Sequence, residues 1–104
     1  MLHIPTMSGK RLQDEAARDW AVLTEDQRED IEYRIRLALG FIMVTGVFAR
    51  WQSPGELPHW QLIIETTWCS DRSERTIARA LKQAIKIAKI DVPKNGVVLK
   101  DHQQ

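Results

Sequence analysis

The sequence of 104 residues predicts a mainly α-helical fold: a small single-domain bundle of about four helices with a short C-terminal β-hairpin or strand. Apolar residues recur three and four positions apart along most of the chain, which is the spacing of one helix face. Residues that cap helices stand where these runs begin. The length suits one small hydrophobic core. We therefore expect a flexible N-terminal arm at 1–8, one helical domain at 9–100 and a tail at 101–104.

The first helix is expected at about residues 9–22, with Ser8 as its cap. Leu12, Ala16, Trp20 and Leu23 follow one another four, four and three residues apart and form one apolar stripe.

A second and longer helix is expected at about residues 25–49. Thr24 and Gln27 have the spacing of a capping box, in which each side chain bonds the other residue's backbone N–H. Residues 37–44 are apolar almost all round, so they form either the buried centre of the domain or half of an oligomer interface. Gly46 follows them and marks a candidate break.

Residues 52–58, QSPGELP, form a loop because their two prolines disfavour helix. Residues 59–69 fit both a helix and a strand. Their β-branched content favours a strand, whereas a helical partner for the next segment favours a helix, and we predict a helix. Another helix then runs from about 72 to 90, capped by Ser70 or Ser73. Pro93 and Gly96 belong to a turn, and the residues around it form a hairpin or a terminal strand.

Charge is distributed unevenly along the chain. Residues 1–71 carry seven Lys or Arg and eleven Asp or Glu, a net charge of −4, whereas residues 72–89 carry six Lys or Arg and only Glu74, a net charge of +5. The six cations lie three or four residues apart, so they form one stripe on a helix: Arg72, Arg75, Arg79, Lys82, Lys86 and Lys89. The stripe is either a binding surface for nucleic acid, a contact for an acidic protein or a solvated helix face, and we favour the first.

Residues 73–81, SERTIARAL, resemble the start of a recognition helix in helix-turn-helix DNA-binding domains. In those families a Ser or Thr caps the helix, a Thr-Val or Thr-Ile pair follows, and an Arg and a Leu come next. The resemblance covers residues 60–99 and implies a helix-turn-helix at 59–90 with a winged-helix wing at 91–99. The family places Ala, Gly and an apolar residue where this chain has Thr67, Asp71 and Arg72. Either the turn is longer than the standard one, or the match is accidental.

The resemblance implies that Arg75 and Arg79 read base edges, with further contacts from Arg72, Ser73 and Thr76. Among the other residues of the segment, Gln83 can pair with adenine. Lys82 and Lys86 are expected to contact phosphate. The predicted nucleic-acid surface is therefore Arg72, Ser73, Arg75, Thr76, Arg79, Lys82, Gln83, Lys86 and Lys89.

Aromatic and apolar residues suggest a second surface. Tryptophan is enriched in the energetically dominant contacts of protein interfaces. The chain has four tryptophans, which form either part of the core or an anchor for a partner. The candidate partner interface consists of Trp51, Trp60, Trp68, Phe41 and Met43. The acidic residues at 25–32 form either a solvated helix face or a surface that mimics nucleic acid or meets a basic partner.

We expect no enzymatic activity, no metal and no cofactor. His3 and His102 lie near the chain ends, and His59 has no nucleophile at a useful spacing. Cys69 is the only cysteine, which excludes an intrachain disulfide and fits a cytoplasmic protein. The longest apolar run, residues 37–44, is too short to span a bilayer.

The sequence thus predicts a small DNA-binding or transcription-related regulator, a candidate homodimer, that uses a basic helix at 72–89. The alternative is a small interaction protein, such as a phage- or plasmid-type inhibitor, adaptor or other accessory protein, that binds another protein rather than DNA.

Overall fold

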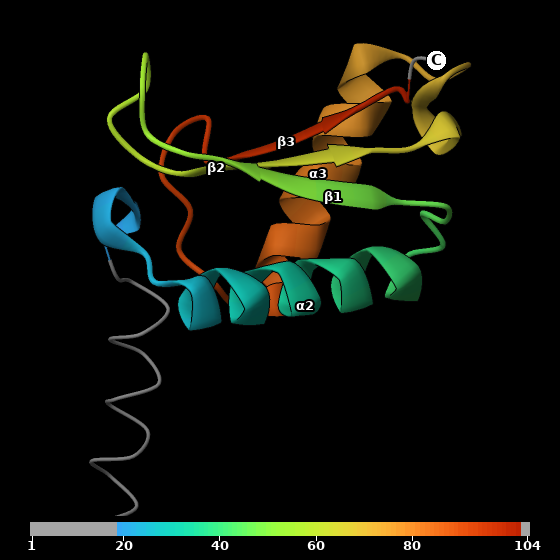
Figure 1. Cartoon of the computed structure of the whole chain (residues 1–104). Helices are drawn as coiled ribbons and strands as arrows, with labels where there is room; N and C mark the ends of the chain where they lie inside the picture. The colour runs from blue at the N-terminus through green and yellow to red at the C-terminus, as the bar shows by residue number, and fades with distance from the viewer. Residues whose placement is uncertain (1–18, 103–104) are drawn as a thin grey trace, which may run out of the picture.

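The computed structural model describes residues 19–102 and shows an α+β fold (Figure 1). The described residues contain two α-helices, α2 (Glu25–Phe41) and α3 (Glu74–Ala88), and three strands, β1 (Phe48–Gln52), β2 (Gln61–Glu65) and β3 (Val97–Lys100). Two short 3-10 helices, η1 (Trp20–Val22) and η2 (Thr67–Cys69), complete the list. The prediction of a mainly α four-helix bundle is therefore wrong.

The three strands form one mixed sheet in the order β1-β2-β3. β1 and β2 are antiparallel, with Arg50 opposite Ile63. β2 and β3 are parallel, with Ile63 opposite Val98. Parallel neighbours need a crossover connection, and α3 provides it.

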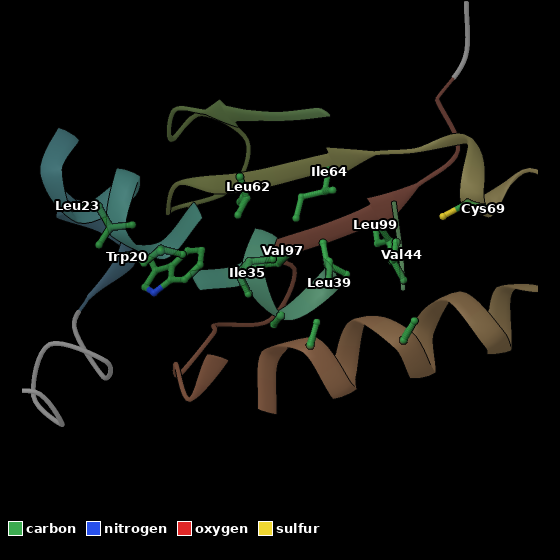
Figure 2. Close-up of a cluster of buried hydrophobic side chains, with 14 residues drawn as sticks. Trp20, Leu23, Ile35, Leu39, Val44, Leu62, Ile64, Cys69, Val97 and Leu99 are labelled. Atoms are coloured by element: carbon green, nitrogen blue, oxygen red, sulfur yellow. The ribbon is translucent and has the colours of Figure 1, made fainter. Parts of the chain in front are cut away.

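Both helices contribute to the core that covers one face of the sheet. The strands contribute Leu62, Ile64, Val97 and Leu99, which alternate with residues of the opposite face. Figure 2 shows these side chains between the strands and the helices. The helices and their flanking loops contribute Trp20, Leu23, Ile31, Ile35, Ala38, Leu39, Val44, Cys69, Ala80 and Ala84.

The opposite face of the sheet carries a small polar cluster. Glu65 pairs with Lys100 at 3.7 Å and lies 3.7 Å from the Nδ1 atom of His102. The His102 ring stacks on Phe48 with 4.8 Å between the ring centres. These contacts tie the segment after β3 to both other strands.

The prediction of a first helix at 9–22 falls partly outside the described residues. Within them, Trp20, Ala21 and Val22 form the short 3-10 helix η1, whose N-terminus is capped by the Asp19 carboxylate at 2.9 Å from the Ala21 N–H. Trp20 and Leu23 are buried, as the apolar stripe predicted.

The second helix begins as predicted but ends eight residues early. The capping box of Thr24 and Gln27 is present. α2 then stops at Phe41, because Met43 adopts a left-handed backbone conformation with a φ of 69°. Val44 N–H bonds Leu39 O and Met43 N–H bonds Gly40 O, which is the bonding pattern of a Schellman motif. Gly46 has a φ of 63°, and β1 follows.

The prediction of a helix at 59–69 is wrong, because this segment contains β2 and η2. β2 is the central strand, and its Leu62, Ile63 and Ile64 are all buried. A strand that is covered on both faces reads as a continuous apolar run rather than an alternating one. The β-branched residues were the correct signal.

The fourth predicted helix, at about 72–90, corresponds to α3, and Ser73 rather than Ser70 caps it. The predicted turn is present, since Gly96 N–H bonds Pro93 O at 2.8 Å. Of the two alternatives for the C-terminal region, the structure has a strand, β3, and not a hairpin. In the described part of the chain, no helix combines the length and apolar content needed to cross a membrane.

Candidate nucleic-acid interface

The N-terminus of α3 is fixed by its cap. The Ser73 hydroxyl accepts a bond from Thr76 N–H at 3.2 Å and lies 3.0 Å from the Thr76 hydroxyl. Glu74 in the first turn complements the helix dipole. The predicted DNA contacts Ser73 and Thr76 are therefore both engaged in holding the start of the helix.

α3 has an apolar face and a cationic face on opposite sides. Ala80 and Ala84 are buried against the core, and Ile77, Leu81 and Ile85 are partly buried around them. At about 100° per residue, the cations point away from this face. Each of them is exposed to solvent, which agrees with the predicted stripe: Arg75, Arg79, Lys82, Lys86 and Lys89.

These five cations, which we call the α3 stripe, are not neutralised by neighbouring acids. Among residues 19–102, the ion pairs involve other side chains, such as Arg34 with Asp30 at 3.1 Å and Arg36 with Glu32 at 3.7 Å. The stripe extends over a helix of 15 residues, or about 22 Å. It therefore presents a continuous positive surface to solvent.

Arg72 differs from the five cations of the stripe. Its guanidinium lies over the Trp68 ring, 4.1 Å from the ring centre, and donates a hydrogen bond to the Trp68 carbonyl. It also pairs with Asp71 at 3.6 Å. Arg72 thus precedes α3 and is held against η2. Gln83, the predicted adenine contact, lies on α3 four residues after Arg79 and is exposed.

The predicted partner interface does not form one surface. Trp51 donates to Glu32 at 3.2 Å and contacts Trp20, and Trp60 lies beneath the Arg28 guanidinium at 3.8 Å. Trp68 follows β2, at the opposite end of that strand from Trp60. All three predicted tryptophans are half-buried in contacts within the domain.

Phe41 and Met43, in contrast, are 78% and 73% exposed. Leu37 of α2 and Ile87 of α3 are also exposed, and with Phe41 they border a shallow apolar groove between the two helices. The apolar stretch at 37–44 is thus divided: Ala38, Leu39 and Val44 lie in the core and Ile42 packs against it, while Leu37, Phe41 and Met43 are exposed.

Cys69 is buried, and burial raises the pKa of its thiol above the ordinary value. Asp101 raises this pKa further, and Arg72 lowers it by a smaller amount. The described residues contain no cluster of three His, Cys, Asp or Glu side chains that could hold a metal ion.

The acidic residues of α2 serve local roles. Glu25 and Asp26 lie in the first turn of the helix, where acids are favourable. Asp30 and Glu32 pair with arginines one turn later. Much of the acidic run is therefore explained by helix stability.

Comparison with protein-family models, curated proteins and solved structures finds no match to this chain. The segment before α3 is a strand and a 3-10 turn, so the helix that a helix-turn-helix requires there is not present. The functional interpretation therefore depends on the charge and exposure of α3.

Proposed function

We propose that this protein is a small DNA-binding regulatory protein of the cytoplasm that contacts double-stranded DNA through α3. The observation that carries the proposal is the α3 stripe: four exposed cations on one face of α3 and Lys89 at its C-cap, none of them in an ion pair among the described residues. Lys and Arg side chains that neutralise phosphates release counterions, which drives binding.

Different parts of the stripe suit different contacts. Arg75 and Arg79 lie near the N-terminal end of α3, and the planar guanidinium matches the edge of guanine in the major groove. Lys82, Lys86 and Lys89 lie further along and suit phosphates, which position a protein without reading sequence. The groove is about 12 Å wide and accepts a helix.

The proposal is tested by fluorescence anisotropy with a labelled mixed-sequence duplex at about 50 mM and about 200 mM salt. Three phosphate contacts, from Lys82, Lys86 and Lys89, predict a slope of about −2.7 in log affinity against log salt, which is a loss of roughly 40-fold over this range. The triple variant Arg75→Glu/Arg79→Glu/Lys86→Glu, three exposed cations of the stripe, should lose binding at both salt concentrations while it keeps its circular dichroism spectrum.

The matched control is Arg36→Glu/Arg50→Glu/Lys100→Glu, which changes the net charge equally at exposed cations outside α3. This control should retain most of the affinity of the wild type. An equal loss of affinity in both triple variants would mean that DNA binding depends only on the net charge of the protein and not on α3. No binding by the wild type at the lower salt concentration would refute the proposal.

A second candidate function is a small interaction protein that inhibits or adapts another protein. The exposed Leu37, Phe41 and Ile87 around one apolar groove favour it, because large apolar side chains in one exposed patch are typical of protein contacts. Such a complex would persist at about 200 mM salt, where phosphate contacts weaken. It would be lost in Phe41→Asp and retained in the α3 triple variant, the opposite of the result expected for DNA.

A further inference from the structure

The sheet has a free edge along β3. In the described chain, β3 pairs only with β2. The carbonyls of Gly96 and Lys100 accept bonds from Leu62 and Thr66 of the β2 side. Because backbone groups alternate along a strand, the N–H and C=O groups of Val97 and Leu99 point away from β2.

This free edge borders an apolar groove beside α3. One wall is formed by the strand residues 97–101, and the other by Ile77, Ala78 and Leu81, with Glu74 at one end. Unpaired strand edges readily add another strand. The backbone and the side chains therefore offer a docking position at the same place.

Two exposed residues of α3 line this groove, Glu74 and Ala78, and Lys82 continues their row along the helix. Glu74, Ala78 and Lys82 follow one another at intervals of four residues and lie along one side of the helix. All three are exposed. This row of three side chains has the acid Glu74 at one end, the small Ala78 at its centre and the base Lys82 at the other end. If α3 packed antiparallel against α3 of a second copy, with the two-fold axis at Ala78, each Glu74 would lie beside the partner's Lys82.

We propose that β3 pairs antiparallel with β3 of a second copy of this chain, which forms a continuous six-stranded sheet. α3 then packs against the partner's α3, with Glu74 beside the partner's Lys82. Lys82 lies at the border between this interface and the rest of the α3 stripe, whose other cations point away from the sheet, so both stripes lie on the same outer surface of the dimer. This proposal concerns self-association and does not depend on DNA binding.

The first test is sedimentation velocity without DNA, over about 1 to 100 µM protein, the concentration range of ordinary specific association. The wild type should sediment as a dimer, with twice the 12.0 kDa mass of one chain. Ala78→Glu, which places two carboxylates at the two-fold axis, should sediment as a monomer. Phe41→Glu, in the exposed apolar patch of α2, should remain a dimer.

Charge exchange tests the orientation of the two helices. Glu74→Lys and Lys82→Glu should each weaken the dimer by at least tenfold in Kd. The double variant Glu74→Lys/Lys82→Glu should restore it, because each ion pair is rebuilt with its signs exchanged. Failure of the double variant to recover would refute the antiparallel arrangement.

Amide hydrogen exchange tests the strand pairing directly and does not require a variant. The N–H groups of Val97 and Leu99 should exchange at least tenfold more slowly in the dimer than after dilution to monomer. A wild type that is monomeric throughout, unchanged exchange at these two amides, or a dimer lost in Phe41→Glu but kept in Ala78→Glu would each overturn the proposal.

Discussion

Thr66 is a fully buried polar side chain that joins three segments of the fold. Its hydroxyl donates to the carbonyl of Thr45, in the loop between α2 and β1, at 2.5 Å. The same oxygen accepts a bond from the N–H of Trp68 in η2 at 3.1 Å. Thr66 therefore fixes where β2 ends and how the chain turns toward α3.

Thr66→Val should lower the free energy of unfolding by about 1–3 kcal/mol, because it keeps the shape of the side chain but leaves two backbone groups without their partner. Urea denaturation of the two proteins measures this difference. Thr67→Val is the control, since Thr67 is exposed, and it should change stability by less than about 0.5 kcal/mol. Equal effects at both positions would mean that the hydroxyl contacts contribute nothing.

At the scale of single elements, the C-terminus of α2 is formed by an unusual residue. Met43 occupies the left-handed position of the Schellman motif, which glycine usually fills. A side chain in this conformation costs about 1–2 kcal/mol. Met43 is 73% exposed, so its side chain recovers little of that cost by burial.

Met43→Gly should raise the free energy of unfolding by about 0.5–1 kcal/mol, because the gain in backbone geometry exceeds the entropy cost of glycine. Thermal unfolding measures the change as a rise in Tm. Phe41→Gly, at the last residue of the helix, should lower stability by up to about 1 kcal/mol. A lower Tm for Met43→Gly would show that the Met43 side chain stabilises the native state.

The two α-helices show what local sequence signals can predict. The capping box at Thr24 correctly located the start of α2, and of the two candidate caps for α3, Ser70 and Ser73, the structure uses Ser73, because capping depends on residues that are close together in the chain. The end of α2 was missed, since Met43 is not a residue type that normally marks a left-handed position. β2 was assigned as a helix because a helical partner for the next segment was given more weight than the β-branched residues.

The candidate site was predictable in part for the same reason. The alignment of Arg75, Arg79 and Lys82 on one exposed face depends only on helix periodicity, and the structure places them there. The engagement of Arg72 with Trp68 depends on the path of η2 before the helix, which spacing along the sequence does not reveal. The free edge of β3 could not be predicted without the sheet order.

At the scale of the whole molecule, β3 completes the fold. It supplies Val97 and Leu99 to the core and pairs with the central strand, whose other side is covered by β1. α2 and β1 come before β2 in the chain, whereas β3 is added only after α3. The last segment of the sequence therefore stabilises residues that were made much earlier.

A chain that ends after residue 96 should not show a cooperative unfolding transition, because β2 loses one of its two ladders and the core loses two buried side chains. Differential scanning calorimetry and near-ultraviolet circular dichroism check this expectation. Lys100→Ala, which removes an exposed side chain from the same strand, should retain a sharp transition. A sharp transition in the shortened chain would show that the rest of the domain folds without β3.

The parallel pairing of β2 with β3 also has a consequence for synthesis on the ribosome. Leu62 and Ile64 emerge from the ribosome long before Val97 and Leu99, with the whole of α3 between them. Since synthesis proceeds at about 5–20 residues per second, β2 keeps one open, apolar edge for seconds. The nascent chain cannot close this edge until β3 has been synthesised, so in that interval β2 is an extended apolar segment of the kind that chaperones bind.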